Sequence, residues 1–519
     1  MTDIVLSTIN ARYIHAAVGL RYLFANLGEL QQKACILEFD SKQRALEIAA
    51  EILSHKPRIV GMGVYIWNTS LTAEVLAILK RVEPNIRLIV GGPEVSYETC
   101  QQAVSAWADH VITGEADLEF ARVCRQLLSE GDPPPKLIHA LAPDLGNINL
   151  PYSLYTEKDI ASRVLYVEAS RGCPFTCEFC LSSLDSAVRG FDLGRLLVEL
   201  ERLLERGARV FKFVDRTFNL SIKTSGAILE FFLQRWQPGM FVHFEMVPDR
   251  MHPKLLELLK AFPPGGIQLE VGIQTFNPSS AALISRRQDY DKLEHNLRYL
   301  RAHTGVHIHA DLIAGLPGED LESFGHGFDR LVALGPQEIQ IGILKRLRGT
   351  PIVRHDETWE MIYNPAPPYE ILRNRVLDFE SLQRIKRFAR FWDLLANSGR
   401  FTSALPLVWS KDGSPFENFL RLSDWLGERL GRLHSIALVQ LAEALFVYLT
   451  TELQIPGAAK ALSEDWFRGG GKRERLPFLE AALQTTALAG ASAQSQPPIG
   501  TSPSSPGNAR QKRHLRTDA

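Results

Sequence analysis

The amino-acid sequence predicts a multidomain α/β protein in which two parallel-sheet domains precede a mostly helical region. The chain has 519 residues, which is too long for one hydrophobic core. Short apolar strands alternate with amphipathic helices from residue 1 to about residue 130, and the alternation restarts near residue 164 and ends near residue 350. Hydrophobic residues make up 45% of the chain and charged residues 23%, the balance of an ordinary globular protein.

The first domain is predicted to be a Rossmann-like, doubly wound parallel sheet. The expected strands are Ile4–Ser7, Cys35–Phe39, Ile59–Tyr65, Ile86–Val90 and His110–Thr113, and the expected helices include His15–Leu27, Ala45–Ser54 and Leu71–Val82. Such sheets bind ligands outside the carboxyl ends of their strands. Gly91, Gly92 and Gly114 fall at those ends, where they either let a bulky ligand approach the backbone or serve ordinary turns.

The second domain is predicted to be a partial (βα)6 TIM-type barrel, because six strand–helix repeats follow one another. The expected strands are Val164–Glu168, Val210–Val214, Phe241–Met246, Ile267–Ile273, His307–Ile313 and Glu338–Leu344. The expected helices are Leu193–Glu205, Ser221–Trp236, Lys254–Phe262, Lys292–Arg301 and Leu321–Leu334. Barrels of this kind carry their chemistry on the loops that follow the strands.

The remaining segments are assigned by composition. Little periodicity and the run Pro133–Pro135 indicate a linker, the regions Tyr369–Leu395 and Trp425–Thr451 are expected to be helical, and the Ala/Ser/Gly/Pro-rich end is expected to be disordered. The predicted boundaries are 1–135, 136–160 (linker), 161–346 (barrel), 347–484 (mostly α extension) and 485–519 (disordered tail).

Charge and cysteine content limit the class of protein. Lys and Arg total 58 against 59 Asp and Glu, so nucleic acid and acidic membranes are not expected partners. The first residues carry no basic region, and no apolar run reaches the roughly 18–20 residues that span a bilayer, so neither a signal peptide nor a membrane span is expected. Six cysteines are too few for a disulfide framework. Cys35, Cys100 and Cys124 are isolated and are expected to be small buried hydrophobes in a reduced, cytoplasmic protein.

The remaining thiols, Cys173, Cys177 and Cys180, lie on the first loop of the predicted barrel. Their spacing of i, i+4, i+7 lets them converge on one metal centre if the loop folds around it. Structural zinc usually takes four ligands, and no fourth Cys or His is near, although zinc stays an alternative. Three cysteines suit an iron–sulfur cluster in which one iron has no protein ligand and stays open to a substrate or cofactor.

With Ser170-Arg171-Gly172 before the first cysteine and Phe179 before the last, this segment resembles the radical S-adenosylmethionine (radical SAM) family, and the resemblance extends over Val164 to about Lys345. It implies that the three thiolates hold a 4Fe-4S cluster and that S-adenosylmethionine chelates the fourth iron. An electron from the cluster would cleave S-adenosylmethionine to a 5′-deoxyadenosyl radical. An external one-electron reductant, such as flavodoxin or ferredoxin, would supply that electron.

The resemblance also implies which residues contact S-adenosylmethionine: Asp215, Glu245, Gln274, Arg286 and Asp311. Asp215 would contact the methionine amino group, although the usual glycines are missing beside it. Gln274 lies in a Gly-Ile-Gln-Thr segment, and Asp311 opens Asp-Leu-Ile-Ala-Gly-Leu-Pro-Gly. A zwitterionic methionine needs a cation for its carboxylate and acceptors for its ammonium. Glu245 and Arg286 could instead form an ordinary ion pair, and Asp311 could cap its strand.

The first domain in turn resembles the cobalamin-binding domain fused to many radical SAM enzymes. The matching segments are Asn10–His15, Gly91-Gly92-Pro93-Glu94-Val95-Ser96 and Gly114-Glu115-Ala116-Asp117. The resemblance implies that Tyr65 and Trp67 face the corrin, although Trp67 could equally be interface core. The Asp-x-His-x-x-Gly loop of other cobalamin proteins is absent, so His15 is expected to start a helix and not to ligate cobalt.

Together the resemblances imply a cobalamin-dependent radical SAM enzyme that methylates an unactivated carbon, belonging to a subgroup with an uncharacterised extension from Leu347. Two alternatives are a cobalamin-assisted radical rearrangement or cyclisation without methyl transfer, and a non-catalytic sensor that binds the cluster or cobalamin. A tRNA methylthiolating enzyme would need a second cysteine trio in the first domain, which is missing. The substrate, expected to be a small molecule, is not revealed by the sequence.

Overall fold

A computed structural model describes residues 2–411, 413–468 and 476–489. The chain folds into two compact units. The first comprises residues up to 231 together with 345–354 and 363–370, and the second comprises residues 232–344, 355–362 and 371 onward. Segments after the predicted barrel therefore return to the first unit.

Six parallel strands form the large sheet of the first unit, in the order β2-β1-β3-β4-β5-β6. They are β1 (Ile4–Asn10), β2 (Ala34–Asp40), β3 (Ile59–Gly63), β4 (Arg87–Gly91), β5 (His110–Thr113) and β6 (Leu137–His139). Ile4 of β1 lies opposite both Ala34 and Ile59, and all seven residues of β1 are buried. This order puts the carboxyl ends of β1 and β3 side by side at the switch point where such sheets bind ligands.

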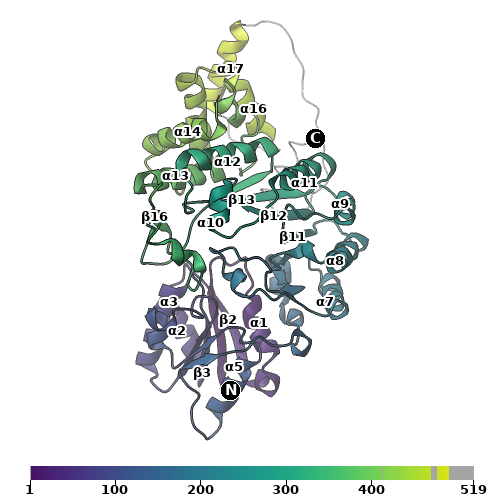
Figure 1. Cartoon of the computed structure of the whole chain (residues 1–519), viewed down its shortest axis with the longest axis vertical. Helices are drawn as coiled ribbons and strands as arrows, with labels where there is room; N and C mark the ends of the chain where they lie inside the picture. The colour runs from purple at the N-terminus through teal and green to yellow at the C-terminus, as the bar shows by residue number, and fades with distance from the viewer. Residues whose placement is uncertain (1, 412, 469–475, 490–519) are drawn as a thin grey trace. The chain divides into compact units, whose positions relative to one another are not determined.

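Helices cover both faces of this sheet (Figure 1). They are α1 (Val18–Ala25), α2 (Ala45–Ser54), α3 (Thr69–Val82), α4 (Ala103–Trp107) and α5 (Glu119–Leu128). One core cluster joins Ile48 of α2 and Val75 of α3 to the sheet. A second cluster joins Leu20 of α1 and Phe120 of α5 to the opposite face. The sheet is therefore doubly wound.

The segment that carries the cysteines also belongs to the first unit. The elements here are α6 (Glu157–Ser162), β7 (Leu165–Val167), β8 (Ser170–Arg171), β9 (Arg189–Gly190), α7 (Leu193–Glu205) and β10 (Val210–Phe213). The next helix, α8 (Ile222–Gln234), begins in the first unit and ends in the second. β7 pairs in parallel with β10, and β8 pairs in antiparallel fashion with β9. The β8–β9 pair brackets the three cysteines. α7 begins where the Asp192 side chain accepts a hydrogen bond from the backbone N–H of Arg195.

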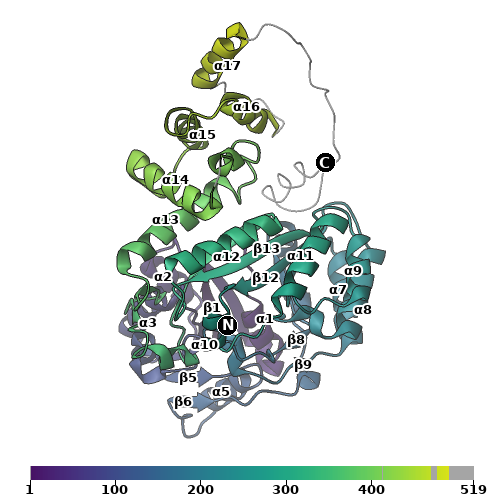
Figure 2. The same ribbon diagram turned by 45° about the horizontal axis from the view of Figure 1, so that its top comes forward.

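In the second unit, four further parallel strands lie in sequence order, with α11 and α12 beside them (Figure 2). The strands are β11 (Phe241–Met246), β12 (Ile267–Gln274), β13 (His307–Ala314) and β14 (Glu338–Ile343). The helices are α9 (Pro253–Lys260), α10 (Pro278–Leu283), α11 (Tyr290–His303) and α12 (Leu321–Leu334). A bulge interrupts the β12–β13 register between Gly272 and Gln274, so the end of β12 is irregular where cofactor contacts are predicted.

The rest of the second unit is mostly helical. After the short strands β15 (Ile362–Tyr363) and β16 (Ile371–Arg373) come α13 (Phe379–Leu395), α14 (Pro415–Leu430), α15 (Leu438–Val447), α16 (Ala458–Arg468) and α17 (Pro477–Ala489). Aromatic side chains join α12 to these helices. The rings of Phe328 and Phe388 stand 5.0 Å apart at 89°, and those of Phe388 and Phe419 stand 4.8 Å apart at 71°.

Two predicted helices of this region are partly wrong. The helix expected from Tyr369 begins only at Phe379, because Asp378 caps it by accepting a hydrogen bond from the backbone N–H of Ser381. The helix expected over Trp425–Thr451 is two helices, because Gly431, with φ of 60°, ends α14.

The large sheet of the first unit has six strands and not the expected five. The sixth strand, β6, lies in the segment that was predicted to be a linker, and α6 begins there too. β6 has three residues, too few for a recognisable pattern. The helix expected from His15 begins at Val18. The predicted tail starts inside α17, and residues 490–519 lie outside the described residues, so the domain boundaries stay predictions. Within the described ranges, no helix is both long and apolar enough to cross a membrane.

Candidate functional site

The backbone of the cysteine loop, residues 173–180, is fixed by local hydrogen bonds. The N–H of Cys173 donates to the carbonyl oxygen of Asp185 at 2.9 Å, and the N–H of Cys180 donates to that of Cys177 at 3.1 Å. Gly172 has φ of +93°, and a Cβ atom there would lie 2.3 Å from the carbonyl oxygen of Ala187. Only glycine fits at the entrance to the loop.

Cys173 and Cys177 are buried, and Cys180 is half-buried. Burial raises the pKa of the Cys173 thiol, the backbone hydrogen bond at Phe175 lowers it, and the nearby Cys180 and Cys177 thiols add to the rise. The three sulfur atoms are therefore close enough to interact electrostatically. A cationic centre that neutralised them would relieve this repulsion.

The donor set fits a cluster better than a single ion. In the part of the chain that the structure describes, no group of three or more His, Cys, Asp or Glu side chains is arranged to hold one metal ion. Three cysteine thiolates would suit a 4Fe-4S cluster, in which each binds a different iron and the fourth iron has no protein ligand.

Asp215 lies against the segment that leads into the cysteine loop. It is 2% exposed. Its carboxylate accepts hydrogen bonds from the Ala169 N–H at 2.9 Å and from the Ser170 hydroxyl at 2.5 Å. Burial raises the pKa of this carboxyl to about 6. Asp215 thus supports the approach to the loop, while its contact with S-adenosylmethionine stays a prediction.

Gln274 and Arg286 come together at the irregular end of β12. Arg286 donates through Nε to the carbonyl oxygen of Ile273 at 3.1 Å and through Nη2 to that of Gly272. Gln274 has φ of +73°, a strained value for a residue other than glycine. Its buried Oε1 atom has no hydrogen-bond partner among the described residues. A buried acceptor without a donor fits a site that a polar ligand completes.

Asp311 belongs to a polar network on β13 that includes a residue not predicted from the sequence, His309. The imidazole of His309 lies 3.4 Å from Asp311 on one side and 3.4 Å from Glu338 of β14 on the other. Burial alone would lower the pKa of His309, but the hydrogen bonds and charges of both carboxylates raise it to about 10. On β11, Glu245 pairs in register with Glu270 of β12. The contacts of Glu245 and Asp311 with S-adenosylmethionine stay predictions.

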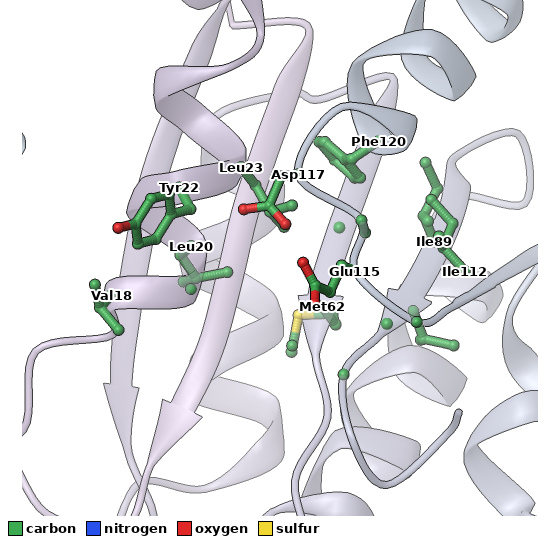
Figure 3. Close-up of a pocket in the computed structure, with 18 of the residues that line it drawn as sticks. Val18, Leu20, Tyr22, Leu23, Met62, Ile89, Ile112, Glu115, Asp117 and Phe120 are labelled. Carbon is green, nitrogen blue, oxygen red and sulfur yellow. The ribbon is translucent and has the colours of Figure 1, made fainter. Parts of the chain in front are cut away.

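A cavity of about 290 Å³ opens in the first unit at the carboxyl ends of the strands (Figure 3). Its walls carry apolar side chains from α1, the sheet and α5, together with the predicted residues Tyr65, Gly91, Gly92, Gly114 and Glu115. At Gly92 and Gly114 there is no space for a side chain. A Cβ on Gly92 would lie 2.6 Å from the Val64 carbonyl oxygen, and one on Gly114 would lie 2.7 Å from the Ala140 carbonyl oxygen.

The polar end of the cavity is organised by Arg171, which comes directly before Gly172 and Cys173. Its guanidinium contacts Glu115 at 2.9 Å, Asp117 at 2.9 Å and Glu168 at 2.8 Å. Figure 3 shows the carboxylates of Glu115 and Asp117 among the apolar lining residues. Arg171 and Asp117 lie in two of the motifs described above, but neither motif predicts that the two side chains meet.

Tyr65 and Trp67 form a stacked pair beside this cavity, with ring centroids 4.5 Å apart and planes 6° apart. Trp67 is 51% exposed, and its indole N–H donates to the carbonyl oxygen of Ile9 at 3.1 Å. Pro93 follows the glycines but is not part of the cavity wall. His15 precedes α1, where its Nδ1 atom shares a 2.7 Å hydrogen bond with the Tyr166 hydroxyl. A flat aromatic pair next to a glycine-lined cavity fits a flat macrocycle with an appended tail.

Comparison with known families agrees with this geometry. Residues 4–123 match the B12 binding domain, and residues 167–331 match the radical SAM superfamily. The chain belongs to the radical SAM superfamily and carries a B12-binding domain. Residues 357–488 match a protein family of unknown function, DUF4080. These assignments confirm the predicted resemblance to radical SAM enzymes that carry a cobalamin-binding domain. With it they confirm the expected cofactors, which are a 4Fe-4S cluster, S-adenosylmethionine and cobalamin.

Curated relatives are similar to a little more than half of this chain. An uncharacterized methyltransferase of Pyrococcus horikoshii is 26% identical over 335 residues, which cover 59% of this chain and 70% of that one. The cobalamin-dependent radical SAM methyltransferase TokK of Streptomyces tokunonensis is 23% identical over 332 residues, covering 56% and 47%. An anaerobic magnesium-protoporphyrin IX monomethyl ester cyclase of Cereibacter sphaeroides is 24% identical over 310 residues, covering 53% and 49%. The chain thus spans only about half the length of the last two.

Solved structures share the fold. The methyltransferase TsrM from Kitasatospora setae, with cobalamin and a [4Fe-4S] cluster bound, superposes with a TM-score of 0.55 at 16% identity over 70% of this chain and 76% of that one. The enzyme OxsB, with aqua-cobalamin and S-adenosylmethionine bound, gives 0.60 at 14% identity over 93% and 83%. The predicted fold class, a Rossmann-like domain followed by a TIM-type fold and a helical region, is confirmed.

Proposed function

We propose that this protein is a cobalamin-dependent radical SAM methyltransferase that methylates an unactivated carbon of a small molecule. When bound, the cluster and S-adenosylmethionine supply a 5′-deoxyadenosyl radical, and cobalamin supplies a carrier for the methyl group. Similarity to methyltransferases over more than half of the chain also supports this function.

One observation carries the proposal: the wall of the glycine-lined cavity and the entrance to the cysteine loop are the same piece of chain. Arg171 lines the cavity and is followed directly by Gly172 and Cys173. Its contacts with Glu115 and Asp117 hold the two sites together inside one unit. A reaction that uses both cofactors on one substrate needs them close and fixed.

The chain's own residues bind and orient the cofactors. Cys173, Cys177 and Cys180 would hold the cluster, and the buried Oε1 of Gln274 would accept a hydrogen bond from the methionine ammonium. Arg286 supplies positive charge at the same strand end, next to Gln274. The stacked aromatic pair and the glycines would receive the corrin and its tail.

The test is anaerobic reconstitution with iron, sulfide and cobalamin, followed by turnover with S-adenosylmethionine whose methyl group carries deuterium. Candidate substrates come from metabolites that accumulate when the gene is deleted. A product heavier by one labelled methyl group, formed together with 5′-deoxyadenosine and S-adenosylhomocysteine, is expected. Cys177→Ala should abolish 5′-deoxyadenosine formation, and the same change at the isolated Cys100, which is exposed, should not. A chain that takes up no cobalamin under these conditions would refute the proposal.

A second candidate is a radical cyclisation or rearrangement without methyl transfer. The observation that favours it is the 24% identity to the anaerobic cyclase over 310 residues. This reaction would give 5′-deoxyadenosine without S-adenosylhomocysteine, and the product would gain no labelled methyl group. The expected external reductant serves both reactions.

A further inference from the structure

After β14 the chain returns to the first unit as a ten-residue segment, residues 345–354, which we call the strap. The strap lies between the residues matched by the radical SAM and DUF4080 families. It begins with a backbone hydrogen bond from the Arg346 N–H to the Tyr369 carbonyl oxygen at 3.0 Å. The strap touches two loops that are far apart in sequence.

The first contact is with the loop that follows the cavity glycines. Arg348 donates to Glu94 at 3.2 Å and to Glu98 at 3.1 Å, and Arg346 contacts Glu98 at 3.2 Å. The Tyr369 hydroxyl donates a second hydrogen bond to Glu94 at 2.8 Å. Glu94 is 4% exposed and lies two residues after Gly92. A buried carboxylate is stable in this place only while its donors remain.

Shape reinforces this contact. Gly349 has φ of +79°, and a Cβ atom there would lie 2.3 Å from the ring of Tyr97. The Gly349 N–H donates to Glu98 at 3.3 Å. The strap is thus fitted closely to the loop, with backbone as well as side-chain contacts.

The second contact is with the cysteine loop itself. Arg354 forms an ion pair with Glu178, which stands between Cys177 and Cys180. The Ile352 N–H donates to the Glu178 carbonyl oxygen at 3.0 Å. The side chain of Glu178 is 4% exposed and that of Arg354 is 58% exposed. The carboxylate is therefore enclosed, on the residue that follows Cys177, whereas the side chain of Arg354 is mostly exposed to solvent.

We propose that the strap positions both cofactor loops, with Arg348 maintaining the corrinoid cavity and Arg354 offsetting the charge of Glu178 next to the cluster. Neither residue needs to touch substrate, so both are positioning residues. The inference rests on the cofactor set and not on methyl transfer.

The physical reason for the second effect is the sign of the charge. Net charge, hydrogen bonding and solvent exposure set the reduction potential of an iron–sulfur cluster. Three thiolates and an enclosed carboxylate all disfavour an added electron, and a guanidinium paired with that carboxylate reduces the penalty. Removing the cation and removing the anion must therefore shift the potential in opposite directions.

The experiment uses the full-length chain, reconstituted anaerobically with iron and sulfide, in four variants: Arg348→Gln, Arg354→Gln, Glu178→Gln and Arg202→Gln. Arg202 is the matched control, since its side chain is 64% exposed, like that of Arg354, and it forms an ion pair with Glu199 on α7. Two quantities are measured for each: the midpoint potential of the cluster, by titration monitored by electron paramagnetic resonance, and the affinity for cob(II)alamin, by absorbance titration.

Arg354→Gln should shift the potential to more negative values, and Glu178→Gln should shift it to more positive values. Arg348→Gln should weaken cob(II)alamin binding by about tenfold or more, because Glu94 loses its cation, and it should leave the potential unchanged. The control should change neither quantity. Because Arg354 is exposed, its variant should fold even if the one at Glu178 does not.

Shifts of the same sign in the Arg354 and Glu178 variants, or no shift in the Arg354 variant, would overturn the inference. An unchanged cob(II)alamin affinity in the Arg348 variant would also overturn it. A wild-type chain that takes up no iron and sulfide would instead refute the proposed function, and the inference with it.

Discussion

Replacing Arg171 by Gln should destabilise the first unit by about 3 kcal/mol. The guanidinium joins three carboxylates, and its side chain is 15% exposed, against 24%, 7% and 10% for Glu115, Asp117 and Glu168. Breaking a buried ion pair costs about 3–5 kcal/mol, because the abandoned charge stays desolvated. The partial exposure of Arg171 and Glu115 places this case at the lower end. About 3 kcal/mol corresponds to roughly a hundredfold change in the unfolding equilibrium.

The assay is equilibrium unfolding of the cofactor-free chain in urea at pH 7.5. The matched control is Arg122→Gln on α5 of the same domain, where the ion pair with Glu119 is 53% exposed on the arginine side. Exposed pairs of this kind contribute about 0–1 kcal/mol. Equal losses in the two variants would show that the cluster of charges around Arg171 is no more than a solvated surface network.

The Arg171 variant also has a predicted pH dependence. Burial raises the pKa of Glu168 even with Arg171 present. Without the guanidinium the pKa should rise further, so protonation removes the unpaired charge more readily. The destabilisation by Arg171→Gln should therefore be smaller at pH 5 than at pH 8, and a penalty that grew on acidification would contradict the electrostatic explanation.

The remaining predictions concern other positions. Gly92→Ala should prevent cobalamin binding in absorbance titrations, because φ of +115° and the 2.6 Å approach of a Cβ to the Val64 carbonyl oxygen force the cavity loop to move. Gln274→Ala should weaken S-adenosylmethionine binding by about tenfold, measured by equilibrium dialysis of the cluster-loaded chain, while iron content stays unchanged. Burial raises the pKa of Asp215 in the folded protein to about 6, above its value in the unfolded chain. Its contribution to the free energy of unfolding is therefore present at low pH and lost as the pH rises through 6. The free energy of unfolding of wild type, relative to that of Asp215→Asn, should therefore fall between pH 4 and pH 6.5 in urea unfolding experiments. A rise over that range would contradict a raised pKa for Asp215 in the folded protein.

Helices in which the apolar pattern repeats over several turns could be predicted from the sequence. α7 and α12 have the predicted bounds, since apolar residues recur at helical spacing and Asp192 and Asp320 cap their first turns. β6 was missed because three residues carry no periodicity and the strand exists only through its pairing with β5. The division of the predicted helix over Trp425–Thr451 does have a sequence signal, Gly431, which ends α14 in the left-handed region.

The residues of the candidate site fall into two groups. Some could be predicted from their own position in the sequence, and others depend on a partner that is distant in the sequence. A thiol in a short metal-binding spacing, or a glycine at the end of a strand, can be predicted as a candidate at its own position, as Cys173 and Gly92 were. Arg171 could not be predicted in this way, because its role depends on the carboxylates of Asp117 and Glu115. These are 54 and 56 residues away in the sequence, and only the fold brings them to Arg171. Arg348 depends on Glu94, which is 254 residues away. Charged residues that hold two loops together carry no local sequence pattern, so in a chain of this kind they are found from the structure.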